Sequence, residues 1–288
     1  MKQDILIGCV ADDFTGASDA ASFLMSKGMK TILFNGKPDG EIPPCQAVVI
    51  ALKSRTQETK SAVADSMAAF TWLKEQGAQH LYFKYCSTFD STKEGNIGPV
   101  VDAMLKVFGE KYTILCPALP VNKRTVENGI LYVDGVPLSE THMKNHPLTP
   151  MWESEIAKLM DPQGKYQTLN VNTELLAKSK EEILAVVDEF GKDKQHFYIV
   201  PDYVNDENGT KIAEVFGDLT VLTGGSGILA PLAAKYQQAQ AAKDSMTNGV
   251  DGKGIVLAGS CSKATLEQIA DFQTKGYASY KIDPMAVL

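Results

Sequence analysis

Short apolar runs alternate with longer segments of helical character along most of this chain, and this alternation restricts the fold more than any other feature. The strand-like runs are Ile5–Val10, Thr31–Phe34, Ala47–Leu52, His80–Tyr85, Tyr112–Cys116, His196–Val200, Leu219–Leu222 and Ile255–Ala258. The helical segments are Ala17–Lys27, Thr59–Gln76, Ile97–Phe108, Glu174–Phe190, Asp206–Phe216 and Ile228–Gln240. We therefore expect an α/β fold with a mostly parallel sheet and helices on both faces.

Two segments interrupt the alternation. Residues 121–166 are rich in proline and turn residues, and they predict an irregular excursion with a hairpin at Ile130–Leu138, turned by Asp134-Gly135. Residues 241–254 are polar and contain glycine, which predicts a linker. We accordingly expect one domain over residues 1–240 and the start of a second α/β domain over residues 255–288.

Composition argues against several classes of protein. The formal net charge of −7 does not suit a duplex nucleic-acid binder, which needs a basic face. No apolar stretch reaches the ~20 residues that a membrane span needs, and the first residues do not read as a signal peptide. The five cysteines are scattered without a C-x-x-C pair, which indicates reduced thiols, a cytoplasmic location and no structural zinc.

Polar or glycine-rich clusters follow nearly every strand-like run. They are residues 12–13, 53–56, 86–92, 117–120, 201–202, 223–227 and 259–262. The carboxyl ends of parallel strands share one edge of the sheet, so we expect these clusters to converge there. Carboxylates, cations and hydroxyls gathered at one edge indicate a site for a small, polar, anionic ligand.

Asp12 and Asp13 stand out because two adjacent carboxylates repel each other and neither helps a core. One of them could simply cap the helix that follows, which would leave the other unexplained. Close carboxylates can also hold a metal ion, share a proton, or divide the roles of base and orienting group. We favour a chemical role for the pair.

Ser54-Arg55 and Lys84 follow two other apolar runs. Surface charge is the ordinary explanation for such cations. At one sheet edge, however, Arg55 could fork onto a carboxylate and Lys84 could supply a point charge. The hydroxyl-rich run of Ser87, Thr88 and Asp90 is either an ordinary capped loop or part of the same site.

The sequence evidence for a functional role is weaker for the glycine-rich loops than for the charged residues. Gly224, Gly225 and Ser226 either form a tight turn or present backbone N–H groups to an anion at a helix N-terminus. Residues 259–262 repeat this pattern, and neither loop has the spacing of a Walker A or dinucleotide motif. His142 and His146 have helical metal-pair spacing, but Pro147 opposes a helix there. We predict no metal site and keep His146 as a substrate contact.

Taken together, the motifs resemble the four-carbon acid sugar kinases, a family once known only as a domain of unknown function (DUF1537). The resemblance covers essentially the whole chain, at residues 11–17, 52–55, 83–92, 95–100, 116–122, 145–151, 222–227 and 259–262. The Tyr85–Asp90 sequence is similar to that of the 3-oxo-tetronate kinase branch.

The resemblance implies a first domain that binds the acid sugar and a second domain that binds ATP. Ser260 and Ser262 match the first ATP-contacting loop of the family. Members of the family continue well past the position that matches Leu288, so we expect residues 255–288 to be an incomplete nucleotide-binding domain. This chain would then carry mainly the substrate-binding half and be inactive alone.

The resemblance also implies roles in ATP- and Mg²⁺-dependent phosphorylation of 3-oxo-tetronate. Asp13 would be the base toward the terminal hydroxyl, and Asp12 would orient substrate or a magnesium-bound water. Arg55 and Lys84 would hold the substrate carboxylate, whereas Ser87, Thr88 and Asp90 would bind its hydroxyls.

Two other functional classes stay open. A phosphatase with an aspartyl nucleophile would also place Asp12 or Asp13 after the first strand, although it expects an Asp-x-Asp motif. The other class is a non-catalytic acid-sugar-binding module. The expected partner is a small acid sugar rather than nucleic acid or membrane, and a homodimer is a candidate assembly.

Overall fold

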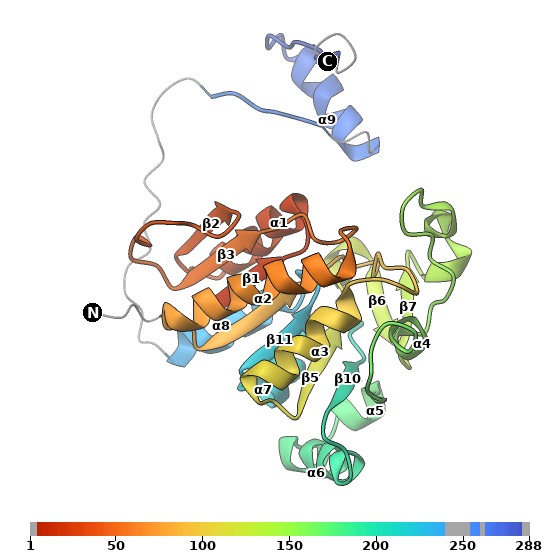
Figure 1. Cartoon of the computed structure of the whole chain (residues 1–288). Coiled ribbons are helices and arrows are strands. Elements are labelled where there is room, and N and C mark those ends of the chain that lie inside the picture. Colours follow the sequence, from red (N-terminus) through yellow and green to blue (C-terminus); the bar gives the residue numbers. More distant parts are fainter. Residues whose placement is uncertain (1–4, 240–253, 260–262, 284–288) are drawn as a thin grey trace. The chain divides into compact units, whose positions relative to one another are not determined.

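The computed structural model places most of the strand-like runs in one sheet whose neighbouring strands are all parallel (Figure 1). It describes residues 5–239, 254–259 and 263–283, and the chain divides into two units between residues 245 and 246. The sheet strands are β1 (Ile7–Ala11), β2 (Thr31–Asn35), β3 (Ala47–Ala51), β4 (His80–Lys84), β5 (Tyr112–Cys116), β9 (Thr168–Val171), β10 (Phe197–Pro201) and β11 (Val221–Gly224). Their order is β2-β3-β1-β4-β11-β5-β10-β9, which confirms the expected parallel α/β sheet.

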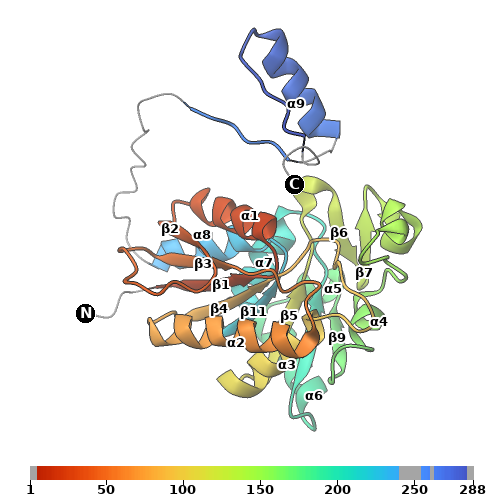
Figure 2. The same ribbon diagram turned by 45° about the horizontal axis from the view of Figure 1, so that its top comes forward.

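Helices cover both faces of this sheet, as expected. Those of the first unit are α1 (Phe14–Met25), α2 (Thr59–Glu75), α3 (Ile97–Phe108), α4 (Ile156–Met160), α5 (Thr173–Leu176), α6 (Lys180–Gly191), α7 (Asp206–Phe216) and α8 (Leu229–Ala239). On one face α8 contacts both α1 and α7, and on the other α2 contacts α3 (Figure 2). None of the helices in the described part of the chain has the length and apolar character of a membrane span.

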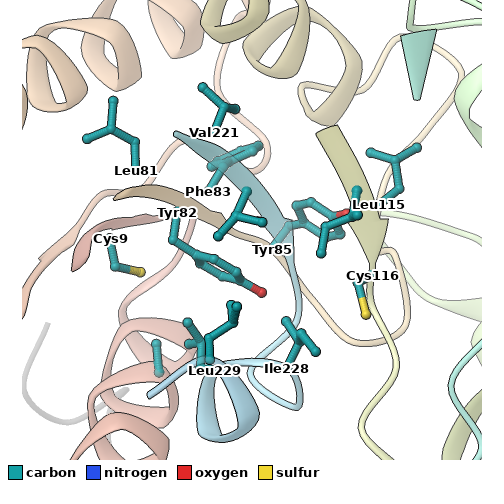
Figure 3. Packing of buried hydrophobic residues seen from close by; sticks show 14 of the residues in the cluster. Cys9, Leu81, Tyr82, Phe83, Tyr85, Leu115, Cys116, Val221, Ile228 and Leu229 are labelled. Atoms are coloured by element: carbon teal, nitrogen blue, oxygen red, sulfur yellow. The ribbon is translucent and has the colours of Figure 1, made fainter. Parts of the chain in front are cut away.

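The central strands are buried on both faces, because helices pack on each side of them. Every residue of β1 and β3 is buried, which explains why their sequences are continuous apolar runs. Figure 3 shows Tyr82 directed from β4 toward the start of α8, Phe83 on the opposite side of β4, and Tyr85 beside β11. These aromatic rings make the core continuous up to the carboxyl end of β4, where the polar clusters begin.

A small antiparallel sheet forms within the excursion. It comprises β6 (Arg124–Glu127), β7 (Ile130–Val133) and β8 (Val136–Pro137), with short 3₁₀ turns at Pro120–Asn122, Leu138–Glu140 and His142–Asn145. Asp134 and Gly135 have φ of 52° and 78°, the pattern of a type I′ turn, so the expected hairpin is confirmed. β6 was not expected.

Asp202 anchors this small sheet to the main one. Its buried carboxylate accepts hydrogen bonds from the backbone N–H groups of Asn128, Gly129 and Thr173, and from Asn170 Nδ2, at 2.8–3.1 Å. The polar cluster after β10 is therefore accounted for by a structural role.

Three expectations need correction. The predicted helix at Glu174–Phe190 is two helices, α5 and α6, because Ser179 forms a capping box with Glu182 and starts a new helix. β9 was missed, because its half-buried sequence carries a weaker apolar signal. No strand forms at Ile255–Ala258: Ile255 is 88% exposed, and no strand of the described residues pairs with it.

The rest of the second unit contributes one described helix, α9 (Lys263–Thr274). The predicted linker at residues 241–254 lies outside the described residues except for Gly254.

Candidate functional site

The carboxyl ends of β1, β3 and β4 meet where the connections diverge. β1 leads through α1 to β2, on one side of it in the sheet, whereas its neighbour β4 leads through α3 to β5, on the other side. Right-handed crossovers in opposite directions place α1 and α3 on opposite faces. A crevice between such strand ends is the usual ligand site of an open α/β sheet.

Asp12 follows β1 and is held by Arg55 from the segment after β3. The guanidinium forks onto the carboxylate, with Nε 3.0 Å from Oδ2 and Nη2 2.8 Å from Oδ1. The backbone N–H groups of Ser54 and Arg55 also donate to the Asp12 carbonyl oxygen. Burial raises the pKa of the Asp12 carboxyl, and the hydrogen bonds and charge of Arg55 oppose that rise.

Asp13 is both a helix cap and a member of the charged cluster. Its Oδ1 accepts the Gly16 N–H at 2.9 Å, as an N-cap does, and lies 2.9 Å from Arg55 Nη2. The side chain is 30% exposed, against 4% for Asp12. Among the described residues, Asp13 Oδ2 has no hydrogen-bond or ion-pair partner, so this oxygen remains available to a ligand.

Asp90 completes the surroundings of Arg55. Its Oδ2 lies 3.7 Å from Arg55 Nη1, and its Oδ1 accepts the Thr88 hydroxyl at 2.5 Å. Between them Phe89 has φ of 52°, and its buried ring packs edge-on against Tyr85. The core thus holds this loop in an unfavourable backbone conformation that places Thr88 and Asp90 beside Arg55.

Lys84 is a buried cation at the end of β4. Its Nζ donates to the Tyr85 carbonyl oxygen at 2.7 Å, and it forms no ion pair among the described residues. A Cβ atom at Gly16 would overlap Asp13 Oδ1 and would lie 2.9 Å from Lys84 Nζ. Gly16 therefore leaves room for Asp13 and Lys84 to lie close together at the start of α1.

The glycine-rich loop at residues 223–227 packs closely against the segment after β5. A Cβ at Gly224, Gly225 or Gly227 would overlap the carbonyl oxygen of Cys116, Pro117 or Ala118, respectively. The Gly225 N–H donates to Cys116 O, so it is not aimed at an anion. Close packing accounts for these glycines, and Ser226 donates its hydroxyl to Asp19.

Two buried tyrosines tie this loop to β4. The Tyr82 hydroxyl donates to Gly225 O at 2.5 Å, and the Tyr85 hydroxyl lies 3.1 Å from Thr223 Oγ1. Figure 3 shows both rings directed from β4 and its end toward β11 and the following loop. The loops after β4 and β11 are therefore held together by the core.

Asn96 is a member of the site that sequence reasoning missed. Its Nδ2 donates to the carbonyl oxygens of Ser54 and Gln57, each at 2.8 Å, and lies 3.4 Å from that of Arg55. Its Oδ1 is buried without a hydrogen-bond partner among the described residues, and Asn96 lines a small cavity of about 10 Å³. The family motif at residues 95–100 contains this residue, but nothing in its spacing indicates a role.

Other predicted residues are not joined to this cluster. His146 accepts hydrogen bonds from Thr149, three residues away, and has no described contact with Arg55 or Asp13. Ser87 lies buried on the loop after β4. Ser260 and Ser262 lie outside the described residues. The described residues also contain no group of three or more His, Cys, Asp or Glu side chains that could hold a metal.

Some charged groups of the site are already engaged within the protein, whereas others can still bind a ligand. Asp12 and Arg55 satisfy each other, whereas Asp13 Oδ2 and two of the three Lys84 ammonium protons have no partner among the described residues. A cation and a carboxylate oxygen beside each other suit a small ligand that carries both an anionic group and a hydroxyl. The site can therefore orient a hydroxy acid.

Comparison with known proteins gives this geometry a family context. Residues 7–232 match the family model described as a sugar-binding N-terminal domain. A 3-oxo-tetronate kinase of Brucella melitensis is 41% identical over 280 residues, covering 96% of this chain and 64% of the relative. One from Haemophilus influenzae is 43% identical over 271 residues, covering 94% and 65%. The chain thus spans just under two thirds of the length of these relatives.

Solved structures agree with the fold. A Haemophilus influenzae protein of the DUF1537 family superposes with a TM-score of 0.83 at 43% identity, covering 93% of this chain and 65% of that one. A domain of unknown function from Bordetella bronchiseptica, a domain-swapped dimer with bound citrate, has a TM-score of 0.68 at 29% identity. That match covers 96% of this chain and 66% of that one.

Proposed function

This chain belongs to the family of sugar-binding N-terminal domains, and on that premise we propose that it is the acid-sugar-binding part of a 3-oxo-tetronate kinase. The observation that carries the proposal is that Asp13 and Lys84 lie close together beside Gly16, each with polar atoms that no described residue engages. The names of relatives that are about 40% identical to this chain support the choice of substrate.

In this proposal Lys84 binds the substrate carboxylate as a point charge. Asp13 Oδ2 accepts the proton of the terminal hydroxyl as that oxygen becomes the nucleophile. ATP, when bound, supplies the phosphoryl group that the hydroxyl oxygen accepts. Ser87, Thr88 and Asp90 face the remaining hydroxyls of the sugar.

Arg55 takes a positioning role here rather than a substrate-binding one. Its guanidinium already faces the carboxylates of Asp12, Asp13 and Asp90. It neutralises the charge that these groups concentrate at one point and fixes the orientation of Asp13. Both carboxylate oxygens of Asp12 accept hydrogen bonds from Arg55, so Asp12 is poorly placed to bind Mg²⁺.

The same geometry disfavours Asp12 as the nucleophile of a phosphatase. An aspartyl nucleophile must present a free oxygen to phosphorus, and both Asp12 oxygens accept hydrogen bonds from Arg55. Asp13 Oδ1 is likewise engaged by Gly16 and Arg55, so Oδ2 is the oxygen of Asp13 that could attack phosphorus, and a trapped phospho-aspartate at Asp13 would revive the phosphatase. A non-catalytic binding module stays an outcome of the test below.

Assembly and location are also proposals. The domain-swapped dimer of the Bordetella bronchiseptica relative supports a homodimer, which light scattering on this chain would detect. The thiols of Cys9, Cys86 and Cys116 form no disulfide within the described part of the chain, which supports a reducing compartment such as the cytoplasm. The ATP contacts of Ser260 and Ser262 rest on the family resemblance.

Calorimetry with stable four-carbon ligands tests the substrate class. The 288-residue chain is titrated with threonate and with erythritol, a neutral polyol of the same length. We expect binding of threonate at least about tenfold tighter than of erythritol, because only the acid can pair with Lys84. Equal affinities would contradict the proposal. Acid-specific binding, together with no phosphorylation by any longer form of the protein, would favour the binding module.

A further inference from the structure

A second cavity lies away from the crevice, between α2, α3 and the segment that follows α4. Its volume is about 320 Å³, and its walls include Val63, Asp102, Lys106, Lys165 and Tyr166. The cavity beneath Arg55 shares none of these lining residues. The proposed function of the crevice makes no use of this second cavity.

The wall formed by residues 163–166 is held firmly against α3. A Cβ at Gly98 would overlap the Gln163 carbonyl, and one at Gly164 would lie 2.6 Å from the Tyr198 hydroxyl. Gln163 Oε1 accepts the Gly98 N–H at 3.0 Å and the Ser91 hydroxyl at 3.1 Å. Because these contacts fix the segment, the cavity is part of the folded structure rather than a gap beneath a loose loop.

Asp102 lines this cavity and has one carboxyl oxygen that no described residue satisfies. The residue is 7% exposed. Its Oδ1 accepts the Tyr198 hydroxyl, whereas its Oδ2 is buried with no hydrogen-bond partner among the described residues. Burial also raises the pKa of this carboxyl. Buried polar atoms nearly always have partners, so an unpaired carboxyl oxygen at a cavity points to a ligand.

The other walls define what such a ligand must carry. Lys106 and Lys165 are exposed and form no ion pair among the described residues, so two ammonium groups are free to meet an anion. Val63 and the Tyr166 ring offer apolar surface between them. Asp102 is the carboxyl among the lining residues, and it suits a hydroxyl group on the ligand.

We propose that this cavity is a second ligand site, which binds a small organic anion carrying a hydroxyl group. The anionic group contacts Lys106 and Lys165, and the hydroxyl meets Asp102. Sugar phosphates and hydroxy acids share this chemistry. The proposal stands independently of the function assigned to the crevice, because the two sets of residues are separate.

Calorimetry on the whole chain with glycerol 3-phosphate tests the site. We expect the double variant Lys106→Gln/Lys165→Gln to bind this probe about tenfold more weakly than wild type. The control Lys27→Gln/Lys74→Gln removes two exposed lysines outside the cavity and should leave the affinity unchanged. Lys84→Met, which alters the crevice, should leave this binding event intact.

The following results would overturn the proposed second site or the role of Asp102 in it. Unchanged affinity in Lys106→Gln/Lys165→Gln would overturn the proposal, as would loss of binding only in Lys84→Met. Inorganic phosphate should bind about tenfold more weakly than glycerol 3-phosphate, because it lacks the carbon-borne hydroxyl. Equal affinities would mean an adventitious ion only. Asp102→Ala should abolish the preference between these two probes, and a retained preference would contradict the role of Asp102.

Discussion

At the scale of single residues, Arg55 organises the site although it is one of only two arginines in the chain. Three carboxylates converge on it, and the fork onto Asp12 is bidentate. Asp12 is buried, so its charge is tolerated only because the guanidinium is fixed beside it. Removing one partner of a buried ion pair is costly, because the other charge is left without compensation.

Arg55→Gln should therefore lower the free energy of unfolding by about 3 kcal/mol near neutral pH. Without the guanidinium the pKa of Asp12 rises further above its ordinary value, since Arg55 opposes that rise. A raised pKa in the folded state gives stability that is present at low pH and lost as pH rises through that pKa. The penalty of the variant should thus be smaller near pH 4 than near pH 7.

Urea unfolding followed by circular dichroism at the two pH values measures this difference. Lys211→Gln is the matched control, because it removes an exposed pair with Glu214 and should cost no more than about 1 kcal/mol at either pH. A penalty for Arg55→Gln that is the same at both pH values, or larger in acid, would argue against the carboxylate cluster.

Gly16→Ala tests the spatial relation of Asp13 and Lys84. The new methyl group would overlap Asp13 Oδ1 and crowd Lys84 Nζ, so acid-sugar affinity should fall about tenfold or more. Alanine is favourable within a helix, so the free energy of unfolding should change by only about 1 kcal/mol. Ser18→Ala, on the exposed side of α1, is the control. Unaltered threonate affinity in Gly16→Ala would show that the pair is not the binding site.

The sequence predicted the sheet edge that holds the site but not the partner of each charge. Asp13 illustrates why, because the same short polar sequence predicts either a helix cap or a chemical role for this residue. In the structure Asp13 caps α1 and also forms an ion pair with Arg55. The Arg55 guanidinium lies near Asp90, and the Arg55 backbone is held by Asn96, and both residues lie far along the chain. Spacing alone does not encode such contacts.

At the scale of elements, Asn96 joins the start of α3 to the segment after β3. Three carbonyl oxygens of that segment face its Nδ2 group. The role is one of positioning, since the side chain acts on Arg55 through the backbone.

Asn96→Asp replaces these donors with acceptors of the same shape. It should raise the threonate dissociation constant about tenfold and lower the free energy of unfolding by about 2 kcal/mol. Asn96→Gln, which keeps the amide, should recover part of the affinity. Calorimetry and urea unfolding check both values, and an Asn96→Asp protein with wild-type affinity would remove Asn96 from the site.

Elements with strong local signals were predicted well, and those that depend on distant partners were not. The Asp134-Gly135 turn carries its own backbone preference, so the hairpin was found. The break between α5 and α6 depends on the helix cap at Ser179. The apolar periodicity of the sequence continues across this position, so it predicts a single long helix. The apolar residues at 255–257 form no strand, because a strand also needs a neighbour with which to pair.

At the scale of the whole molecule, the strand order determines where the crevice forms. Membership of the family of sugar-binding N-terminal domains supports the proposal that the crevice binds an acid sugar. β1 and β4 are neighbours whose connections leave in opposite directions, so Asp13 and Lys84 lie close together at the point where these connections diverge. The central claim is that this pair, rather than Arg55, receives the acid.

Calorimetric titration of threonate into Lys84→Met and Asp13→Asn tests that claim most directly. Lys84→Met should lose at least about tenfold in affinity, because the carboxylate loses its charge partner, while urea unfolding shows that the protein remains folded. Asp13→Asn keeps the cap and the shape, so its affinity should stay within about threefold of wild type. A Lys84→Met protein that binds threonate as tightly as wild type would contradict the account.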